Sequence, residues 1–183
     1  MTKRVDQRNA QAGGDIAGGD ITKVIYERPK TRLEVMVSNL QRDVEQDSDA
    51  KEFIASLQRW TVKSTEYRRN LEQKLTACGK ENLIKDATAA KEAFAKQLLR
   101  TTFRSALQEV YAHILQLVWS KFTHEIKPKI AADASADTEL AICQLATEID
   151  QQLANAPPEL GLSVQEVLGM LYYLTGNCHI DWD

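Results

Sequence analysis

An apolar repeat that runs from Glu81 to about Lys127 most constrains what this chain can fold into. Its apolar residues recur every three or four positions, which predicts helix, and the stripe shifts phase near Leu98. Such a shift predicts a bend or a break into two helices. The later half carries a second apolar row, so we expect it to be the central helix of a bundle. Pro128 is expected to end it, because proline lacks an amide donor and clashes with the preceding turn.

Three shorter amphipathic helices are predicted before this repeat. The first begins at a capping box, in which Thr31 and Glu34 each satisfy an unpaired amide of the helix start. The second begins around Ser48, and the third ends at Gly79, a residue type suited to a left-handed helix end. The side chains expected to be buried are Leu33, Met36, Val37, Leu40 and Val44 in the first helix, Phe53, Ile54, Leu57 and Trp60 in the second, and Leu71, Leu75 and Cys78 in the third.

Two helices are predicted after the repeat, one with an apolar stripe over residues 142–153 and one that ends the domain. The last helix has a capping box at Ser163 and Glu166 and a stop signal at Gly176. Its apolar character extends around the helix as far as Tyr172 and Tyr173, so either neighbouring helices enclose it or it meets another protein. Together these patterns predict an all-α fold over residues 29–183, a helical bundle of about six or seven helices with one long central helical hairpin or bent helix.

A glycine-rich arm, residues 1–28, precedes the helices. It contains the sequence Gly-Gly-Asp-Ile twice, with a period of five residues, and continues into the β-forming segment 22–26. Glycine turns joined to short extended pieces, which we expect to include short β segments, fit this pattern. Ile16 and Ile21 are its repeated apolar anchors. One interpretation is an arm that adds a strand to a partner's sheet or self-associates into a homo-oligomer, and the other is a flexible leader.

Composition narrows the class of protein. A formal net charge of −3 and a pI near 5.7 argue against binding to nucleic acid through bulk charge, so we expect contact with DNA only indirectly, through a complex. The apolar stretch 114–119 is far too short to cross a bilayer, and no signal peptide is recognisable, so no membrane contact is expected. Three widely spaced cysteines suit free thiols in a reducing compartment, which predicts a cytoplasmic protein.

The last ten residues, 174–183, alternate apolar and polar side chains, which predicts a short extended tail. Cys178, Ile180 and Trp182 would form its apolar face and should be buried, in this domain or in a partner. The polar face would carry His179, Asp181 and Asp183. We interpret the tail as a docking or locking element. The predicted partner-binding residues are Cys178, His179, Ile180 and Trp182 of the tail, Tyr172 and Tyr173 of the last helix, and Ile16 and Ile21 of the arm.

Recognisable catalytic motifs are absent from the sequence: it has no nucleophile elbow, zinc-binding cysteine pairs, dinucleotide fingerprint or phosphate loop. His113 and His124 lie eleven residues apart, roughly 16 Å along a helix, too far to share a metal. Cys178 and His179 are adjacent and would point to opposite faces of an extended chain. We therefore expect no enzymatic activity, no cofactor and no metal.

Two segments suggest a family, the repeat Gly-Gly-Asp-Ile-Ala-Gly-Gly-Asp-Ile-Thr near the N-terminus and the end Met170-Leu-Tyr-Tyr-Leu-Thr-Gly-Asn-Cys-His-Ile-Asp-Trp-Asp183. They resemble the C-terminal domain of bacterial ABC three-component systems, which are conflict or phage-defence operons. In that family an effector carrying such a domain works with a small middle component and an ABC ATPase of the chromosome-maintenance type.

The family's effectors usually carry a toxic domain, such as a nuclease or protease, in front of this one. Only about 30 residues precede the first helix here, so we expect no such domain. The resemblance then implies a coupling module, an adaptor or scaffold that binds the ATPase, the middle component or an effector. Two alternatives stay open: a structural protein that self-assembles through the arm, and a metal-dependent hydrolase using His179, Asp181 and Asp183.

Overall fold

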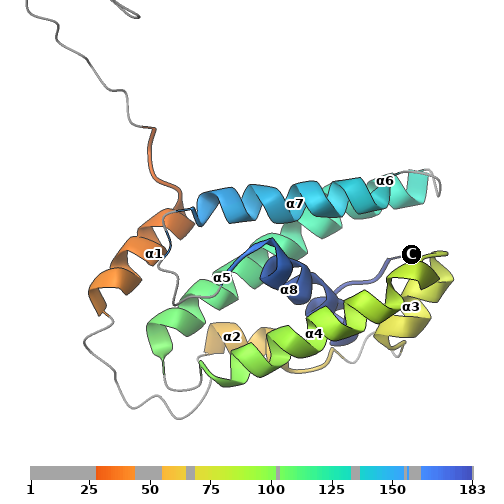
Figure 1. Cartoon of the computed structure of the whole chain (residues 1–183), viewed down its shortest axis with the longest axis horizontal. Coiled ribbons are helices and arrows are strands. Elements are labelled where there is room, and N and C mark those ends of the chain that lie inside the picture. The colour runs from red at the N-terminus through yellow and green to blue at the C-terminus, as the bar shows by residue number, and fades with distance from the viewer. Residues whose placement is uncertain are drawn as a thin grey trace, which may run out of the picture.

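The computed structural model describes residues 28–43, 55–64, 69–101, 104–132, 137–154, 156 and 162–182. Most of them are helical, and none of these residues forms a strand (Figure 1), so the predicted all-α fold is confirmed. Most of the predicted arm lies outside the described residues, including Ile16 and Ile21. Phe53, Ile54 and Asp183 lie outside them as well.

Helices α1 (Arg32–Asp43), α2 (Ala55–Thr61) and α3 (Leu71–Ala77) form the N-terminal part of the bundle. The predicted capping box of α1 is present: the amide of Thr31 donates to Glu34 Oε2 over 2.6 Å, and the amide of Glu34 donates to Thr31 Oγ1 over 3.2 Å. Gly79 has φ +67°, the left-handed conformation predicted for the end of the third helix. A second capping box, between Asn70 and Gln73 at the start of α3, was not predicted.

The long apolar repeat forms a helical hairpin. A 3₁₀ turn (Glu81–Leu83) leads into α4 (Ile84–Leu99), and after a short connection α5 (Ser105–Lys121) runs back along the molecule (Figure 1). The break falls where the stripe changes phase, as the sequence predicts. Both rows of α5 are largely buried, including Val110, Ile114 and Leu115 on successive turns.

The prediction that Pro128 ends this helix is wrong. A π-helical segment (Phe122–Ile126) joins α5 to α6 (Lys127–Ala132), and the chain continues through the proline. The amide of Lys127 donates to the carbonyl of Phe122, five residues back. Such a wider turn at the position before proline is a known way for a helix to adjust to the ring and the missing amide.

Helix α8 (Val164–Gly176) lies inside the bundle, with α4, α5 and α7 (Thr138–Gln152) packed around it. Every residue from Gly169 to Gly176 is buried, so the interpretation that neighbouring helices enclose the last helix is confirmed. A Cβ at Gly169 would lie 2.8 Å from the carbonyl oxygen of Ala90, which explains the close approach of α8 to α4. The centre of the fold, expected at α5, is thus shared by α5 and α8.

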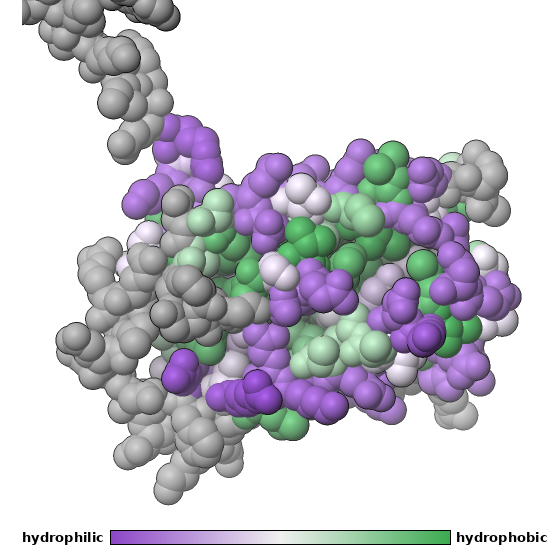
Figure 2. Space-filling view, in the orientation of Figure 1, coloured by the Kyte–Doolittle hydropathy of each residue, from purple (hydrophilic) through white to green (hydrophobic). Residues whose placement is uncertain are grey.

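The stripe predicted for α7 is buried as expected, at Ile142, Leu145, Ala146, Ile149 and Leu153. Figure 2 shows an apolar band in the middle of one face, between α7 and α4, with hydrophilic side chains along both edges. With α5, the π-helical segment and α6 taken as one continuous helix, the described residues hold α1, α2, α3, α4, α5–α6, α7 and α8, the upper end of the predicted range. No helix in the described ranges is long and apolar enough to span a membrane.

Candidate functional site

The C-terminal tail folds back onto the connection between α2 and α3, so that residues far apart in sequence meet. We call this assembly the C-terminal lock and define it as residues 174–182 together with Trp60, Val62, Arg69 and Lys74. The amide of Ser64 donates to the carbonyl of Asn177 over 3.0 Å, and the side-chain amide of Asn177 donates to the carbonyl of Trp60 over 3.3 Å. The lock thereby joins α8 to the N-terminal helices.

The end of α8 sets the direction of the tail. Cys178 adopts φ 64°, the only left-handed non-glycine residue among those described. Its amide donates to Thr175 and the amide of His179 donates to Leu174, over 3.2 and 2.9 Å. These bonds form a Schellman motif, which normally uses glycine at this position. Gly176, predicted as the stop, is instead the last helical residue of α8.

Lys74 is the centre of the polar contacts, although its side chain is only 1% exposed. Its ammonium donates to the carbonyl of Thr175 over 3.0 Å and to the carbonyl of Ile180 over 2.7 Å. The first carbonyl belongs to the last turn of α8, where the helix dipole favours a cation. One buried charge therefore connects α3, the end of α8 and the tail.

Trp182 anchors the far end of the tail and is 1% exposed. Its indole N–H donates to Thr175 Oγ1 over 3.1 Å, and that hydroxyl donates to the carbonyl of Leu171 over 2.9 Å. Its ring packs against Phe122, with ring centroids 5.1 Å apart. An aromatic ring with a satisfied polar atom is a strong anchor in a protein interior.

Asp181 is also buried, at 8% exposure, although it belongs to the predicted polar face. Arg69 Nη2 lies 3.1 and 3.0 Å from its two carboxylate oxygens. The same carboxylate accepts from the amide of Trp182 over 3.1 Å. Alternation along the tail therefore does not divide buried from exposed side chains, because Arg69 makes the carboxylate compatible with burial.

His179 is the half-buried member of the lock. Its Nε2 lies 2.9 Å from the carbonyl oxygen of Val62, and its ring meets Trp60 edge-on at 5.4 Å between centroids. Burial lowers the pKa of His179 below its ordinary value, and hydrogen bonds with the main chain of Val62 and Trp60 oppose this shift. The ring is therefore held in place by α2 and the residue that follows it.

The structure places six of the eight predicted partner-binding residues, and all six belong to α8 or the lock. Tyr172, Tyr173, Cys178, Ile180 and Trp182 are buried in this domain, and His179 is half-buried. The predicted burial of the tail's apolar face is thus met inside the chain itself. The role of these residues in binding a partner stays a prediction.

Sequence reasoning missed Lys74 and Arg69 as members of the site. The signal for Lys74 was present, because Leu71, Lys74, Leu75 and Cys78 occupy positions i, i+3, i+4 and i+7 of one helix face. A lysine on such a face has to find oxygen acceptors inside the fold. Arg69 carried no comparable signal, since its partner lies 112 positions away.

The side chains proposed for a metal-dependent hydrolase do not converge among the described residues. His179 contacts the carbonyl of Val62, and Asp181 pairs with Arg69. Asp183 lies outside the described residues. In the ranges described, no three His, Cys, Asp or Glu side chains are grouped as metal ligands would be.

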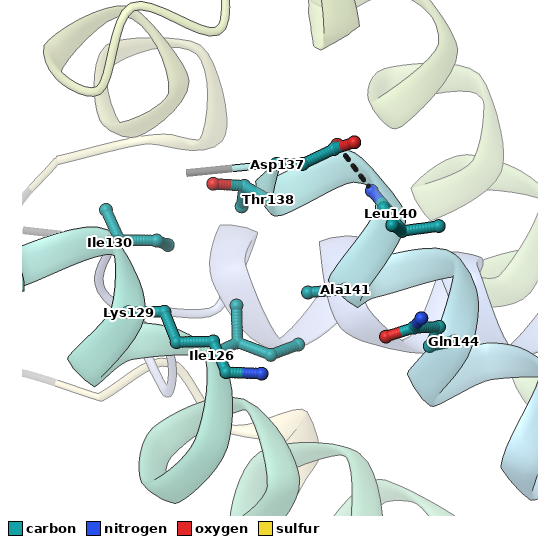
Figure 3. A pocket seen from close by; sticks show the side chains of 8 residues that line it. All are labelled: Ile126, Lys129, Ile130, Asp137, Thr138, Leu140, Ala141 and Gln144. Carbon is teal, nitrogen blue, oxygen red and sulfur yellow. Dashed lines mark hydrogen bonds between the residues drawn. The ribbon is translucent and has the colours of Figure 1, made fainter. Parts of the chain in front are cut away.

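A separate hollow of about 170 Å³ lies between α6 and the start of α7 (Figure 3). Ile126, Ile130 and Ala141 give it an apolar lining. The carboxylate of Asp137 at its edge accepts from the amide of Leu140 over 3.0 Å, so it serves as the N-cap of α7. None of the predicted site residues lines this hollow.

The fold and the lock define a class of protein: a helical domain whose own C-terminal tail packs back against its N-terminal helices. The comparison with family models gives the particular family: residues 70–182 match C-terminal domain 9 of the ABC three-component systems. The match covers well over half of the chain, so the chain belongs to this family, and the resemblance drawn from the sequence is confirmed. Comparisons with curated proteins and with solved structures gave no significant match.

Proposed function

We propose that this chain is a non-catalytic adaptor or scaffold subunit of a bacterial antiphage or conflict system, active in the cytoplasm. It couples an ABC ATPase of the chromosome-maintenance type to an effector through protein–protein contacts. The observation that carries the proposal is the family match over residues 70–182, because domains of this family belong to systems with several protein components. The match extends to Trp182, the anchor of the C-terminal lock.

The chemistry of the lock supports a binding role over a catalytic one. His179 and Asp181, the side chains of the hydrolase alternative, are each held by a different part of the protein, at Val62 and Arg69. Groups that act together in hydrolysis have to meet at one reacting atom. In this chain they connect the tail to the helices instead.

The outer face of the lock is the surface we assign to partner contact. Val62 is 65% exposed and lies beside the half-buried ring of His179. The buried side chains of Cys178, Ile180 and Trp182 fix the tail that carries His179. An exposed valine beside an aromatic ring fits the apolar centre of a protein interface better than its polar rim.

Coexpression with the proteins of neighbouring genes tests the proposal. We expect the ATPase or the middle component to copurify with the wild-type chain, and Val62→Glu to reduce the recovered amount at least fivefold. Leu99→Glu is the matched control, because Leu99 is 66% exposed and lies at the end of α4. The adaptor proposal fails if the wild-type chain recovers neither protein, and the assigned surface fails if both variants recover equal amounts.

A further inference from the structure

A groove of about 450 Å³ runs between α1, α2 and α5 and borders the C-terminal lock at Trp60. Its floor includes Ala112 and Trp60, which are 6% and 3% exposed. Ligand sites in proteins commonly have volumes of about 300–1,000 Å³. The groove is therefore large enough to hold several side chains of a bound segment.

Positive charge reaches this groove from two helices. Arg32 is the first residue of α1, and Arg59 lies on α2 with its guanidinium 4.8 Å from the centroid of the Trp60 ring. In the described part of the chain, the ion pairs involve other side chains and leave both guanidinium groups without a carboxylate partner. Among the described residues of the lining, Glu109 is the one acidic side chain.

His113 on α5 also lines the groove, and its pKa responds to the charge of Arg32. Burial lowers the pKa of His113 below its ordinary value, and the charge of Arg32 lowers it further. The imidazole is therefore predominantly neutral at neutral pH, and the positive charge of the groove comes from the two arginines. A guanidinium offers paired N–H donors that match a carboxylate.

The groove also has an apolar wall, and this decides between classes of anion. Met36 and Ala112 contribute apolar surface beside the arginines. A phosphate or a nucleic-acid backbone would leave that surface unused, and the net charge of −3 opposes binding to a polyanion. A peptide can place carboxylates on the arginines and an adjacent apolar side chain on the wall.

We propose that the α1–α2–α5 groove binds an acidic segment of a partner protein, with carboxylates at Arg32 and Arg59 and an apolar side chain against Met36 and Ala112. This proposal extends the proposed adaptor function, and it depends on that function for one point: that the partner is a protein of the same system. Trp60 is common to the groove and the lock, but Val62 and His179, which form the outer face of the lock, do not line the groove.

Fluorescence anisotropy with the full chain tests the proposal directly. The probe is a labelled twelve-residue peptide in which aspartates flank a leucine, compared with the same peptide carrying asparagines. We expect Arg32→Glu/Arg59→Glu to weaken binding of the acidic peptide at least tenfold. Arg100→Glu/Arg104→Glu is the matched control, because both arginines are exposed and the change in net charge is the same. This control should change the affinity less than twofold.

Three results would overturn the groove assignment: equal binding of the asparagine peptide, equal loss in the control variant, or tighter binding of a twelve-nucleotide single-stranded DNA than of the acidic peptide. Circular dichroism checks that the variants fold, and Arg32→Gln/Arg59→Gln provides a milder second pair that should weaken binding at least threefold. Coexpression separates this proposal from the adaptor function. The adaptor proposal fails if no partner copurifies with the wild-type chain. The groove assignment fails if Arg32→Glu/Arg59→Glu and Arg32→Gln/Arg59→Gln both bind the acidic peptide with wild-type affinity.

Discussion

The C-terminal lock and the α1–α2–α5 groove both gather positive charge, but they use it in different ways. In the lock, Lys74 and Arg69 are satisfied by groups of the chain itself, the carbonyls of α8 and the tail and the carboxylate of Asp181. In the groove, Arg32 and Arg59 line a hollow. A buried charge with internal partners fixes a fold, whereas a charge at the edge of a hollow can serve recognition. The comparison predicts large stability effects in the lock.

Trp182→Ala should have the largest effect. The variant removes a buried ring that packs on Phe122 and donates to Thr175. We expect the free energy of unfolding to fall by about 3–5 kcal/mol, measured by urea denaturation. Trp182→Phe keeps most of the packing and loses the indole donor, so it should cost about 1–2 kcal/mol. Equal losses in the two variants would contradict an anchor made mainly by packing.

Lys74→Met should have the next largest effect. The substitution keeps the length of the side chain but removes the donor from the carbonyls of Thr175 and Ile180. Bonds to a charged donor contribute about 1.5–3 kcal/mol each, and the apolar replacement recovers part of this, so we expect a loss of about 2–4 kcal/mol. Lys85→Met on the exposed face of α4 is the control and should change stability by less than about 0.5 kcal/mol. A lock variant as stable as this control would mean that Lys74 does not hold the tail.

The Arg69–Asp181 pair should contribute less, because water reaches the arginine. The side chain of Arg69 is 38% exposed and that of Asp181 is 6% exposed. A double-mutant cycle with Arg69→Gln and Asp181→Asn should give a coupling energy of about 0.5–1 kcal/mol. A coupling near zero would show that Asp181 stabilises the tail through the amide of Trp182 alone.

Local rules in the sequence predicted most of the fold. The capping box at Thr31 and Glu34 and the left-handed Gly79 follow from neighbouring residues alone. The failures concern how two helical segments end. Pro128 stays within a helix because a π-helical turn precedes it, and Cys178 takes the conformation predicted for a glycine while the surrounding lock holds the tail.

The candidate site was predicted only in part, because local patterns indicate which side chains are buried but not which distant groups they contact. The apolar residues of the tail were identified by alternation, because their burial depends on their own chemistry. Lys74 bonds to residues 101 and 106 positions away, and nothing local indicates which carbonyls it meets. The groove was not predicted at all, since its charged residues come from three helices whose arrangement the stripes do not specify.

The smallest effects we predict come from the two histidines, one in each region. Burial lowers the pKa of His179 in the lock and of His113 in the groove. Between the ordinary value near 6.5 and the lower folded value, the unfolded chain binds more protons than the folded chain. Stability is therefore fully present above about pH 7 and should decline as the pH falls through this window.

Urea denaturation at pH 7.5, 6.5 and 5.5 measures this decline, and His179→Gln and His113→Gln should each make it shallower. At His179 main-chain acceptors oppose the shift and the charges of Arg59 and Lys74 add to it, whereas at His113 the charge of Arg32 adds to it. Arg32→Gln should therefore raise the pKa of His113, followed by its NMR chemical shift, and leave that of His179 unchanged. If both pKa values move together, the charge of Arg32 reaches the lock, as the charge of Arg59 does. If only His113 responds, the charge of Arg32 acts within the groove, where it is available to an acidic segment.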